Sequence, residues 1–282
     1  LPWTAYWTRD DQRETMTTTI ALAGKGGTGK TTLSALLIRY LMEERSGAIL
    51  AIDADPASNL HYVLGMELYQ TIGEIREDML EQVQTSGALA GSMPGGMSKQ
   101  EYLDYQVQMS LVEGERIDLL AMGRPEGQGC YCAANQMLRL ILDRLKGNYD
   151  YVVIDNEAGM EHLSRRTTRD VDVLLLVTDP TQRGLITAQR MQEMVPELEI
   201  GVGHTYLVLN RLRGERTVAD VPEPLAQAIE EAELDLIGVL PEESTMAEFE
   251  FTGRPLVELP AGSGLYGAVR EIGEEILENG GR

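Results

Sequence analysis

Three sets of residues in this sequence have the types and spacing that chemistry requires: a loop rich in glycine and lysine, aspartates that follow apolar runs, and two neighbouring cysteines. In the loop, four residues separate Gly24 from a Gly-Lys-Thr sequence, which is the spacing of a phosphate-binding P-loop. Glycines let successive backbone N–H groups turn around an anion, Lys30 adds a positive charge, and the Thr31 hydroxyl can reach a magnesium ion. The residues expected to bind a nucleotide here are Gly26, Gly27, Thr28, Gly29, Lys30, Thr31 and Thr32.

The same loop holds an unusual second lysine, Lys25. Phosphate-binding loops do not require a lysine at this place, so a solvated surface charge is the alternative. Only four lysines occur in the whole chain, however, and two of them lie in this loop. This concentration favours a phosphate contact, and we count Lys25 with Lys30 among the candidate catalytic residues.

The residues around the loop predict the elements that would position it. Residues 19–23 form a short apolar run, and leucines recur at helical spacing from residue 33 to residue 41. The expected order is therefore strand, loop, helix, which places the partial positive charge of a helix N-terminus beneath the phosphates. A glycine-rich turn without a ligand is the alternative, and the combination of motif and context disfavours it.

Aspartates follow two more apolar runs. Asp53 and Asp55 come at the end of residues 48–52, and Asp155 ends residues 151–154. The carboxyl ends of parallel strands border the crevice in which ligands bind, so we expect these carboxylates near the nucleotide. In enzymes with a P-loop, an aspartate on a second strand helps to hold Mg²⁺. We assign that role to Asp155, with Thr31 and with Asp53 in the water shell of the metal.

The remaining carboxylate, Asp55, is the candidate that orients the attacking water and is therefore predicted to be catalytic. Hydrolysis of a nucleotide depends mainly on positioning and on neutralisation of charge. Losing Asp55 should consequently slow hydrolysis more than it weakens binding. Capping of a helix or closing of a turn is the alternative for both Asp53 and Asp55.

Asn210 and Arg211 end the apolar run 206–209, at a place where a base could lie. An asparagine amide can pair with the donor and acceptor edge of adenine. P-loop GTPases carry Asn-Lys-x-Asp at this place, whereas this chain lacks the aspartate that would accept from guanine. The sequence therefore favours ATP, with closure of a turn as the alternative role for Asn210.

Cys130 and Cys132 are the only cysteines of the chain, and a single residue separates them. A disulfide is disfavoured by the short ring and by a reducing compartment. Two inert core thiols are a second interpretation, although the glycines at 127 and 129 indicate an exposed loop. The third is a metal site, in which a twofold axis would bring four thiolates together. Zinc favours a tetrahedral set and Ni²⁺ accepts a square one, and the spacing does not choose between them.

Strand-like and helical patterns alternate along the chain and predict an α/β fold with a doubly wound, mainly parallel sheet and helices on both faces. We expect one domain over residues 16–282, with an acidic, helical insertion at about 66–114. Residues 1–15 differ in character, and we interpret them as a flexible N-terminal extension.

The formal net charge of -21 argues against a nucleic-acid or anionic membrane partner, because both attract basic surfaces. No apolar run approaches the length that spans a membrane, and no basic segment precedes an apolar one at the start. These features predict a cytoplasmic location.

Taken together, the lysine-bearing loop, the Asp53 and Asp55 pair and Asp155 resemble the deviant Walker A ATPases, the class of MinD, ParA, ArsA and the nitrogenase iron protein. Within this class, the sequences Gly129-Cys130-Tyr131-Cys132 and Asp155-Asn156-Glu157-Ala158-Gly159-Met160-Glu161-His162 are similar to the CooC-type nickel maturation factors of carbon monoxide dehydrogenase. The resemblance extends from about Met16 to the C-terminus.

This resemblance implies a Mg²⁺-dependent ATPase that forms a homodimer with ATP, in which Lys25 reaches the phosphates of the partner. It implies that Cys130 and Cys132 of both subunits hold one nickel ion for delivery to carbon monoxide dehydrogenase, or to acetyl-CoA synthase. The alternative within the class is an ATP-dependent electron donor or iron-sulfur carrier like the nitrogenase iron protein, which also uses two cysteines per subunit across a dimer axis. A zinc-stapled dimer without enzymatic activity is a further alternative.

Overall fold

The computed structural model of this 282-residue chain describes residues 17–75, 77–78, 97, 101, 105, 108–123, 141–142, 145–159, 170–198, 200–214 and 217–279. The predicted N-terminal extension, most of the predicted insertion and both cysteines lie outside these residues.

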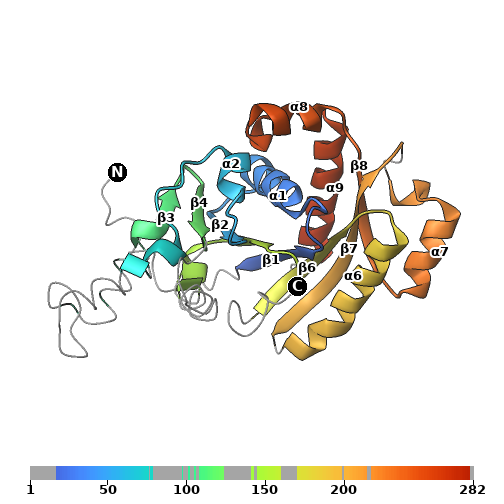
Figure 1. Cartoon of the computed structure of the whole chain (residues 1–282), viewed down its shortest axis with the longest axis horizontal. Coiled ribbons are helices and arrows are strands. Elements are labelled where there is room, and N and C mark those ends of the chain that lie inside the picture. The colour runs from blue at the N-terminus through green and yellow to red at the C-terminus, as the bar shows by residue number, and fades with distance from the viewer. Residues whose placement is uncertain are drawn as a thin grey trace.

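Strands and helices alternate along most of this part of the chain (Figure 1). The strands are β1 (Thr18–Gly24), β2 (Ile49–Ala54), β3 (Leu111–Glu113), β4 (Ile117–Ala121), β5 (Tyr151–Asn156), β6 (Asp170–Thr178), β7 (Gly201–Leu212) and β8 (Leu236–Pro241). The α-helices are α1 (Lys30–Glu44), α2 (Leu60–Leu64), α6 (Gln182–Met194), α7 (Glu223–Glu231), α8 (Thr245–Thr252) and α9 (Gly264–Asn279). Short 3-10 turns occupy Lys146–Asn148, Val195–Leu198, Val218–Asp220 and Leu256–Glu258.

The strands form one eight-stranded sheet in the order β3-β4-β2-β5-β1-β6-β7-β8. All neighbouring strands are parallel except the edge strand β3, which pairs antiparallel with β4. The order reverses direction around β1, so strands are added on both sides of the P-loop strand. The predicted doubly wound, mainly parallel sheet is therefore confirmed.

Alternation along β1 shows how both faces of the sheet are covered. Ile20 and Leu22 belong to a hydrophobic cluster with α1, α2 and α9, whereas Ala21 and Ala23 belong to a second cluster with α6 and α7. Successive side chains of a strand point to opposite faces, so one apolar run serves two layers of helices. The free energy of folding comes mainly from the apolar surface that these two layers remove from water.

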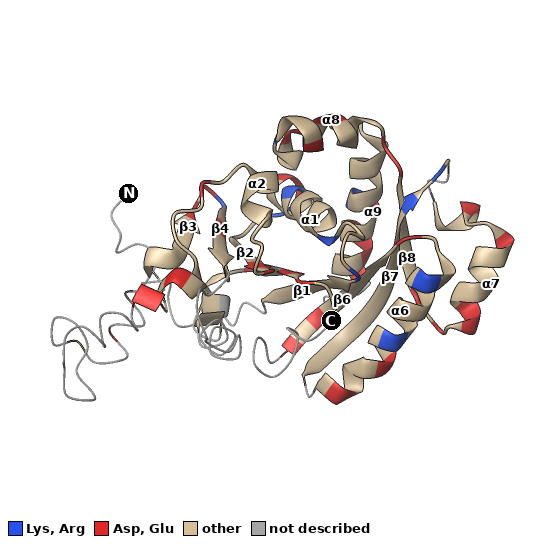
Figure 2. Ribbon diagram, in the orientation of Figure 1, with Lys and Arg blue, Asp and Glu red and all other residues tan. Residues whose placement is uncertain are grey.

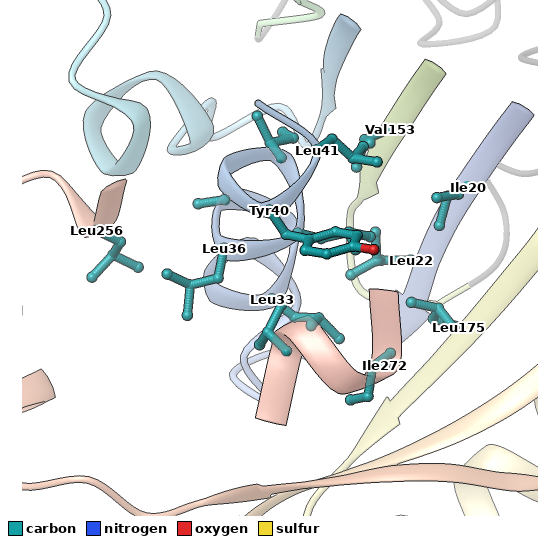
Figure 3. Packing of buried hydrophobic residues seen from close by; sticks show 14 of the residues in the cluster. Ile20, Leu22, Leu33, Leu36, Tyr40, Leu41, Val153, Leu175, Leu256 and Ile272 are labelled. Carbon is teal, nitrogen blue, oxygen red and sulfur yellow. The ribbon is translucent and has the colours of Figure 1, made fainter. Parts of the chain in front are cut away.

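Helix α1 is buried along most of its length, because it lies between the sheet and α9. Figure 3 shows Leu33, Leu36 and Tyr40 among residues that include Leu22 and Ile272. A Cβ atom at position 273 of α9 would lie 2.5 Å from the Tyr40 ring, so Gly273 permits this close approach of the two helices.

Polar groups fix the same pair of helices in place. Arg39 of α1 binds the Glu43 carboxylate at 2.8 Å, donates to the Leu259 carbonyl at 2.5 Å, and stacks over the Tyr266 ring of α9. The Tyr266 hydroxyl donates to the same Glu43 carboxylate at 2.5 Å. Since the P-loop leads directly into α1, this network fixes the position of the helix that follows the loop.

Two elements differ from the sequence expectation. Residues 111–113, at the end of the predicted helical insertion, form strand β3, and β7 spans 12 residues instead of the predicted 206–209. The first half of β7 contains Gly201, Gly203 and an exposed His204 and so has no apolar pattern. Its strand conformation comes from pairing with β6, in the register Asp170↔Gly201 to Thr178↔Leu209.

No α-helix of the described residues is long and apolar enough to cross a bilayer.

Candidate functional site

The P-loop lies between the end of β1 and the start of α1, as predicted. Lys30 is the first residue of α1 and is only 6% exposed. Its ammonium donates to the Gly24 carbonyl at 3.2 Å and to the Lys25 carbonyl at 3.3 Å. Burial lowers the pKa of Lys30, while the negative charges of Asp155, Asp55 and Glu157 act to raise it. The lysine charge therefore sits inside the loop, and carboxylates from two other strands surround it.

Asn210 braces the loop from the end of β7. Its side-chain nitrogen donates to the Thr28 carbonyl at 2.7 Å. The next residue, Gly29, has a φ of 95°, and a Cβ atom there would lie 2.1 Å from the same Asn210 nitrogen. Glycine is thus required at position 29 both for its backbone conformation and for the space that Asn210 occupies.

The polar groups of Asn210 are only partly used by these contacts. Its side-chain oxygen accepts from the Arg211 N–H at 2.8 Å, and Arg211 adopts a φ of 63°, which is uncommon for a residue with a side chain. An asparagine amide has two donor hydrogens and two acceptor lone pairs. One donor hydrogen and one acceptor lone pair of the Asn210 amide therefore remain for the edge of a base. Adenine recognition by Asn210 and Arg211 stays a prediction.

Asp53 and Asp155 lie side by side at the carboxyl ends of β2 and β5, where they are paired in register. The Asp53 carboxylate is fully buried and accepts from the backbone N–H groups of Leu60 at 2.9 Å and Asp55 at 3.1 Å. Burial raises the pKa of Asp53 to about 7, against the lowering effect of these hydrogen bonds. Asp53 therefore closes the turn after β2, which was the alternative role in the sequence analysis. Its role near a metal ion stays a prediction.

Asp155 meets the start of α1. It is 1% exposed, accepts from the Ser34 hydroxyl at 3.2 Å, and is hydrogen-bonded to the Thr31 side chain. Burial raises the pKa of Asp155 to about 6, although Thr31, Lys30 and Ser34 all favour the charged form. The two side chains predicted to hold Mg²⁺ directly, those of Thr31 and Asp155, are thus brought together.

The other two candidate catalytic residues lie nearer the surface. Asp55 is half-buried, and its carboxylate accepts from the Ala57 N–H at 2.8 Å. Lys25 is exposed, and its ammonium has no hydrogen-bond or ion-pair partner within the described ranges. The Lys25 carbonyl, in contrast, accepts from both Thr28 and Lys30, so the backbone of this residue is fixed while its side chain is free to reach a ligand.

Sequence reasoning missed several supporting contacts of this site. Ser34, one turn after Thr31, orients the Asp155 carboxylate, and Asn156 donates to the Leu22 carbonyl at 2.8 Å. The backbone of Gly159 also donates to the Gly24 carbonyl at 3.1 Å, which ties the loop after β5 to the P-loop. Ser34 follows Thr31 by three residues and so lies on the same face of α1, and this spacing is the sequence signal that could have identified it.

Cys130 and Cys132 lie outside the described residues, so the metal site predicted for them stays a prediction. Within those residues, no group of three or more histidine, cysteine, aspartate or glutamate side chains is arranged to hold a metal ion. The Mg²⁺ site predicted for Thr31 and Asp155 would consist instead of a hydroxyl and a carboxylate beside the phosphate loop, where bound phosphates would supply further oxygen ligands.

A family model for the CobQ/CobB/MinD/ParA nucleotide binding domain matches residues 19–256. The chain belongs to this family. The match begins at β1 and includes the P-loop, all strands of the sheet and the end of β7, so it covers each described residue of the candidate site.

Relatives of known sequence and structure agree with this assignment. An uncharacterized ATP-binding protein of Methanocaldococcus jannaschii is 44% identical over 258 residues, which are 92% of this chain and 98% of that protein. The carbon monoxide dehydrogenase accessory protein CooC of Rhodospirillum rubrum is 29% identical over 250 residues, or 85% of this chain and 89% of CooC. The septum site-determining protein MinD of Pyrococcus horikoshii, solved with Mg-ADP, superposes with a TM-score of 0.64 at 23% identity, over 93% of this chain and 96% of that chain.

These relatives confirm the family to which the resemblance pointed, and the superposition confirms the fold. The narrower identification with nickel maturation factors rests on the cysteine motif and on the similarity to CooC, and it belongs to the proposal that follows.

Proposed function

We propose that this chain is an ATP-hydrolysing metallochaperone that dimerises with ATP and binds nickel through Cys130 and Cys132 for insertion into carbon monoxide dehydrogenase. The observation that supports the ATPase part is the meeting of Lys30, Thr31 and Asp155 at one edge of the sheet. The similarity to CooC and the Cys-x-Cys sequence support the nickel part.

In the first part of this proposal, the P-loop binds the phosphates of ATP. Lys30 already lies in the loop with its ammonium on backbone carbonyls, and it would exchange these weak neutral partners for charged phosphate oxygens. Thr31 and Asp155 would hold Mg²⁺, with Asp53 in its water shell; the ion would neutralise charge on the phosphates. Asn210 and Arg211 would face the base.

Hydrolysis needs a water molecule positioned for attack, and we assign this to Asp55. Its carboxylate is half-buried and is fixed by the Ala57 N–H, so it can accept a hydrogen bond from water without moving. Asp55→Asn should reduce the rate of ATP hydrolysis by two orders of magnitude or more while leaving the ATP Kd within about threefold, as expected for a group that acts mainly in the transition state.

The second part of the proposal is a homodimer that ATP stabilises. The exposed Lys25 ammonium lacks a partner within the described part of its own chain, and phosphates of an opposed protomer would supply one. Hydrolysis then removes this contact and loosens the dimer, because a ligand shifts an equilibrium only through its differential affinity for the two states. If the cysteines of both protomers share one ion, closure and opening change the affinity for nickel.

Metal titration with and without ATP, combined with measurement of dimer mass, tests the proposal. We expect one Ni²⁺ per two chains, tighter binding when ATP is present, and loss of this binding in the Cys130→Ala, Cys132→Ala variant. Unchanged nickel affinity in that variant would contradict the chaperone function. Zn²⁺ should be titrated in parallel, since two thiolates per chain also suit a tetrahedral ion.

Analysis of the same purified protein distinguishes the electron-donor alternative from the nickel chaperone. Iron and acid-labile sulfide in anaerobically purified protein, with visible absorption, would support an iron-sulfur carrier in place of a nickel chaperone. A zinc-stapled dimer without activity would show neither ATP turnover nor iron. Delivery itself is tested by the activation of nickel-free carbon monoxide dehydrogenase, with acetyl-CoA synthase as the second acceptor.

A further inference from the structure

Helix α6 presents a surface unlike the rest of this acidic chain. Arg183, Ile186, Arg190 and Met194 are all exposed and follow one another at intervals of three and four residues, so they lie on one face of the helix. We call these four residues the α6 stripe. The opposite face of the helix, with Leu185, Ala188 and Met191, is buried against the sheet.

The two arginines of the stripe form no side-chain ion pair or hydrogen bond within the described part of the chain. Arg39, Arg213, Arg254 and Arg270 each form an ion pair with a glutamate. The side chains of Arg183 and Arg190, by contrast, have neither an ion-pair nor a hydrogen-bond partner among the described residues. Figure 2 shows blue positions on α6 together with red ones, whereas α7 carries red ones. Helix α6 also carries the exposed Glu193, three residues after Arg190, so its two arginines and one glutamate leave a small excess of positive charge, in contrast to the net charge of -21 of the chain.

Exposed apolar side chains lie between and beside these charges. Ile186 is 41% exposed and Met194 is 43% exposed. Arginine and methionine are enriched where proteins bind one another, because the guanidinium can form bidentate pairs with carboxylates and methionine adapts its shape to a partner. The stripe thus combines charge for orientation with apolar area for affinity.

We propose that the α6 stripe is a docking surface for a partner protein that presents carboxylates around an apolar side chain. Charge complementarity decides this chemistry, since a basic partner would meet the rest of this acidic surface equally well and would not need the stripe. An anionic membrane is a poorer fit, because it would present negative charge to the whole facing surface of this acidic chain, whereas a partner protein can confine its carboxylates to the stripe.

The position of α6 links this surface to the nucleotide site. Gly184, Thr187 and Met191 of α6 line a narrow recess together with Gly24 and Lys25 of the P-loop. A partner that packs against the exposed face of α6 therefore presses on a helix that borders the loop. Docking and nucleotide state are expected to influence one another, as linkage requires when two ligands bias one element.

The identity of the partner rests on the proposed function, so the test uses carbon monoxide dehydrogenase from the same organism as the probe. Binding of the full-length chain is measured by biolayer interferometry in the presence of Mg-ATP. We expect Arg183→Ala combined with Arg190→Ala to raise the Kd by about tenfold or more, and a change from 50 mM to 300 mM NaCl to weaken the parent complex. Ile186→Ala with Met194→Ala should raise the Kd without changing the salt dependence.

A matched control makes the net charge more negative by the same amount at another place. Tyr62→Glu with Phe251→Glu lowers the formal net charge by two, as the double arginine variant does, but alters exposed residues of α2 and α8. This control should bind as the parent does. An equal loss in both variants, or no loss in the stripe variant, would overturn the inference. The inference would also be overturned if the parent chain did not bind the dehydrogenase, or if it bound anionic vesicles through Arg183 and Arg190.

The outcomes also separate this inference from the proposed function. If the parent chain docks through the stripe but does not activate nickel-free dehydrogenase, the result supports the docking surface and contradicts the delivery function. If the chain activates the enzyme equally well with and without the stripe arginines, the result supports the delivery function and contradicts the docking surface. Because the stripe lies outside the nucleotide and metal residues, ATP-dependent nickel binding should be the same in the parent and the stripe variant.

Discussion

At the scale of single residues, the Ser34 hydroxyl is the contact that fixes the Asp155 carboxylate from within α1. Ser34 is fully buried, and its loss would leave one carboxylate oxygen with fewer donors in a dry environment. We expect Ser34→Ala to raise the Mg²⁺ concentration needed for half-maximal ATP turnover several-fold, corresponding to about 1 kcal/mol for one hydrogen bond. The measurement is ATPase activity across a Mg²⁺ series.

Thr252→Ala is a suitable control for this variant. It removes a hydroxyl that donates to the Glu248 carbonyl at 2.7 Å and to the Phe249 carbonyl at 3.5 Å, both within α8 and far along the chain from the nucleotide edge. This control should leave the Mg²⁺ dependence unchanged. A Ser34→Ala variant with the Mg²⁺ dependence of the parent would show that Asp155 needs no help from α1.

The buried carboxylate of Asp53 predicts a pH dependence. Its pKa is raised by burial to about 7, so the folded chain holds the Asp53 proton over a range in which the unfolded chain has lost it. The contribution of Asp53 to stability in the absence of metal is therefore full below its unfolded pKa and is lost as the pH rises toward 7.

The same proton competes with a metal ion. Between pH 8 and pH 6, the protonation of Asp53 should weaken Mg²⁺ binding by about tenfold, with a smaller addition from Asp155, whose pKa is raised by burial to about 6. Calorimetric titration of the Mg²⁺-nucleotide complex at several pH values measures this effect. A constant affinity over this range would mean either that Asp53 does not titrate between these pH values or that it does not lie beside the ion.

The sequence alone was sufficient to place Lys30, Thr31 and Asp155 together, because the P-loop spacing and the strand-end aspartate each identify a fixed place in a parallel sheet. It was insufficient for the supporting contacts. Ser34 and Asp155 are 121 residues apart, and Asn210 and Thr28 are 182 residues apart. Such pairs follow from the order of strands in the sheet, which local patterns do not specify.

At the scale of elements, helix α9 depends on a carboxylate that lies outside it. Glu243, just after β8, accepts from the Ser263 hydroxyl at 2.6 Å and from the Leu265 N–H at 2.9 Å, and also from the Thr245 hydroxyl at 2.7 Å. Burial acts to raise the pKa of Glu243, but these hydrogen bonds outweigh it and hold the pKa below its ordinary value. The start of α9 is therefore capped by a charged side chain from the neighbouring loop.

Glu243→Gln should destabilise the chain by about 1–2 kcal/mol, because an amide group replaces one of the acceptors at a site that supplies only donors. Glu242→Gln is the matched control. Glu242 pairs with Arg213 at the surface, and such exposed ion pairs contribute little. Urea denaturation of both variants gives the comparison. The difference between them should vanish as the pH falls below the pKa of Glu243, since a lowered pKa stabilises only the ionised form.

Long apolar strands and the helices between them could be predicted from the sequence, whereas β3 and the first half of β7 could not. The three residues of β3 are too few to show a period, and Gly201 and Gly203 have low strand propensity. Both segments become strands because a neighbouring strand supplies hydrogen bonds. In this protein, as in other sheets, tertiary pairing decides where intrinsic preference is weak.

At the scale of the whole molecule, the net charge of -21 and the basic stripe of α6 predict opposite responses to salt. Two copies of this chain repel one another, so salt should favour the proposed ATP-dependent dimer by screening this repulsion. The complex at the α6 stripe depends on attraction between opposite charges, so salt should weaken it. Raising NaCl from 50 mM to 300 mM is therefore expected to lower the dimer Kd several-fold while it raises the Kd for the docked partner.

Sedimentation of the Asp55→Asn variant with Mg-ATP measures the dimer without interference from hydrolysis. Glutamate salts at the same ionic strength provide a control for specific effects of chloride, and ADP in place of ATP shows how much self-association is independent of the third phosphate. A dimer that salt weakens would contradict this prediction. It would mean that attraction between opposite charges, such as Lys25 with the phosphates of the partner, dominates over the repulsion between the two acidic chains.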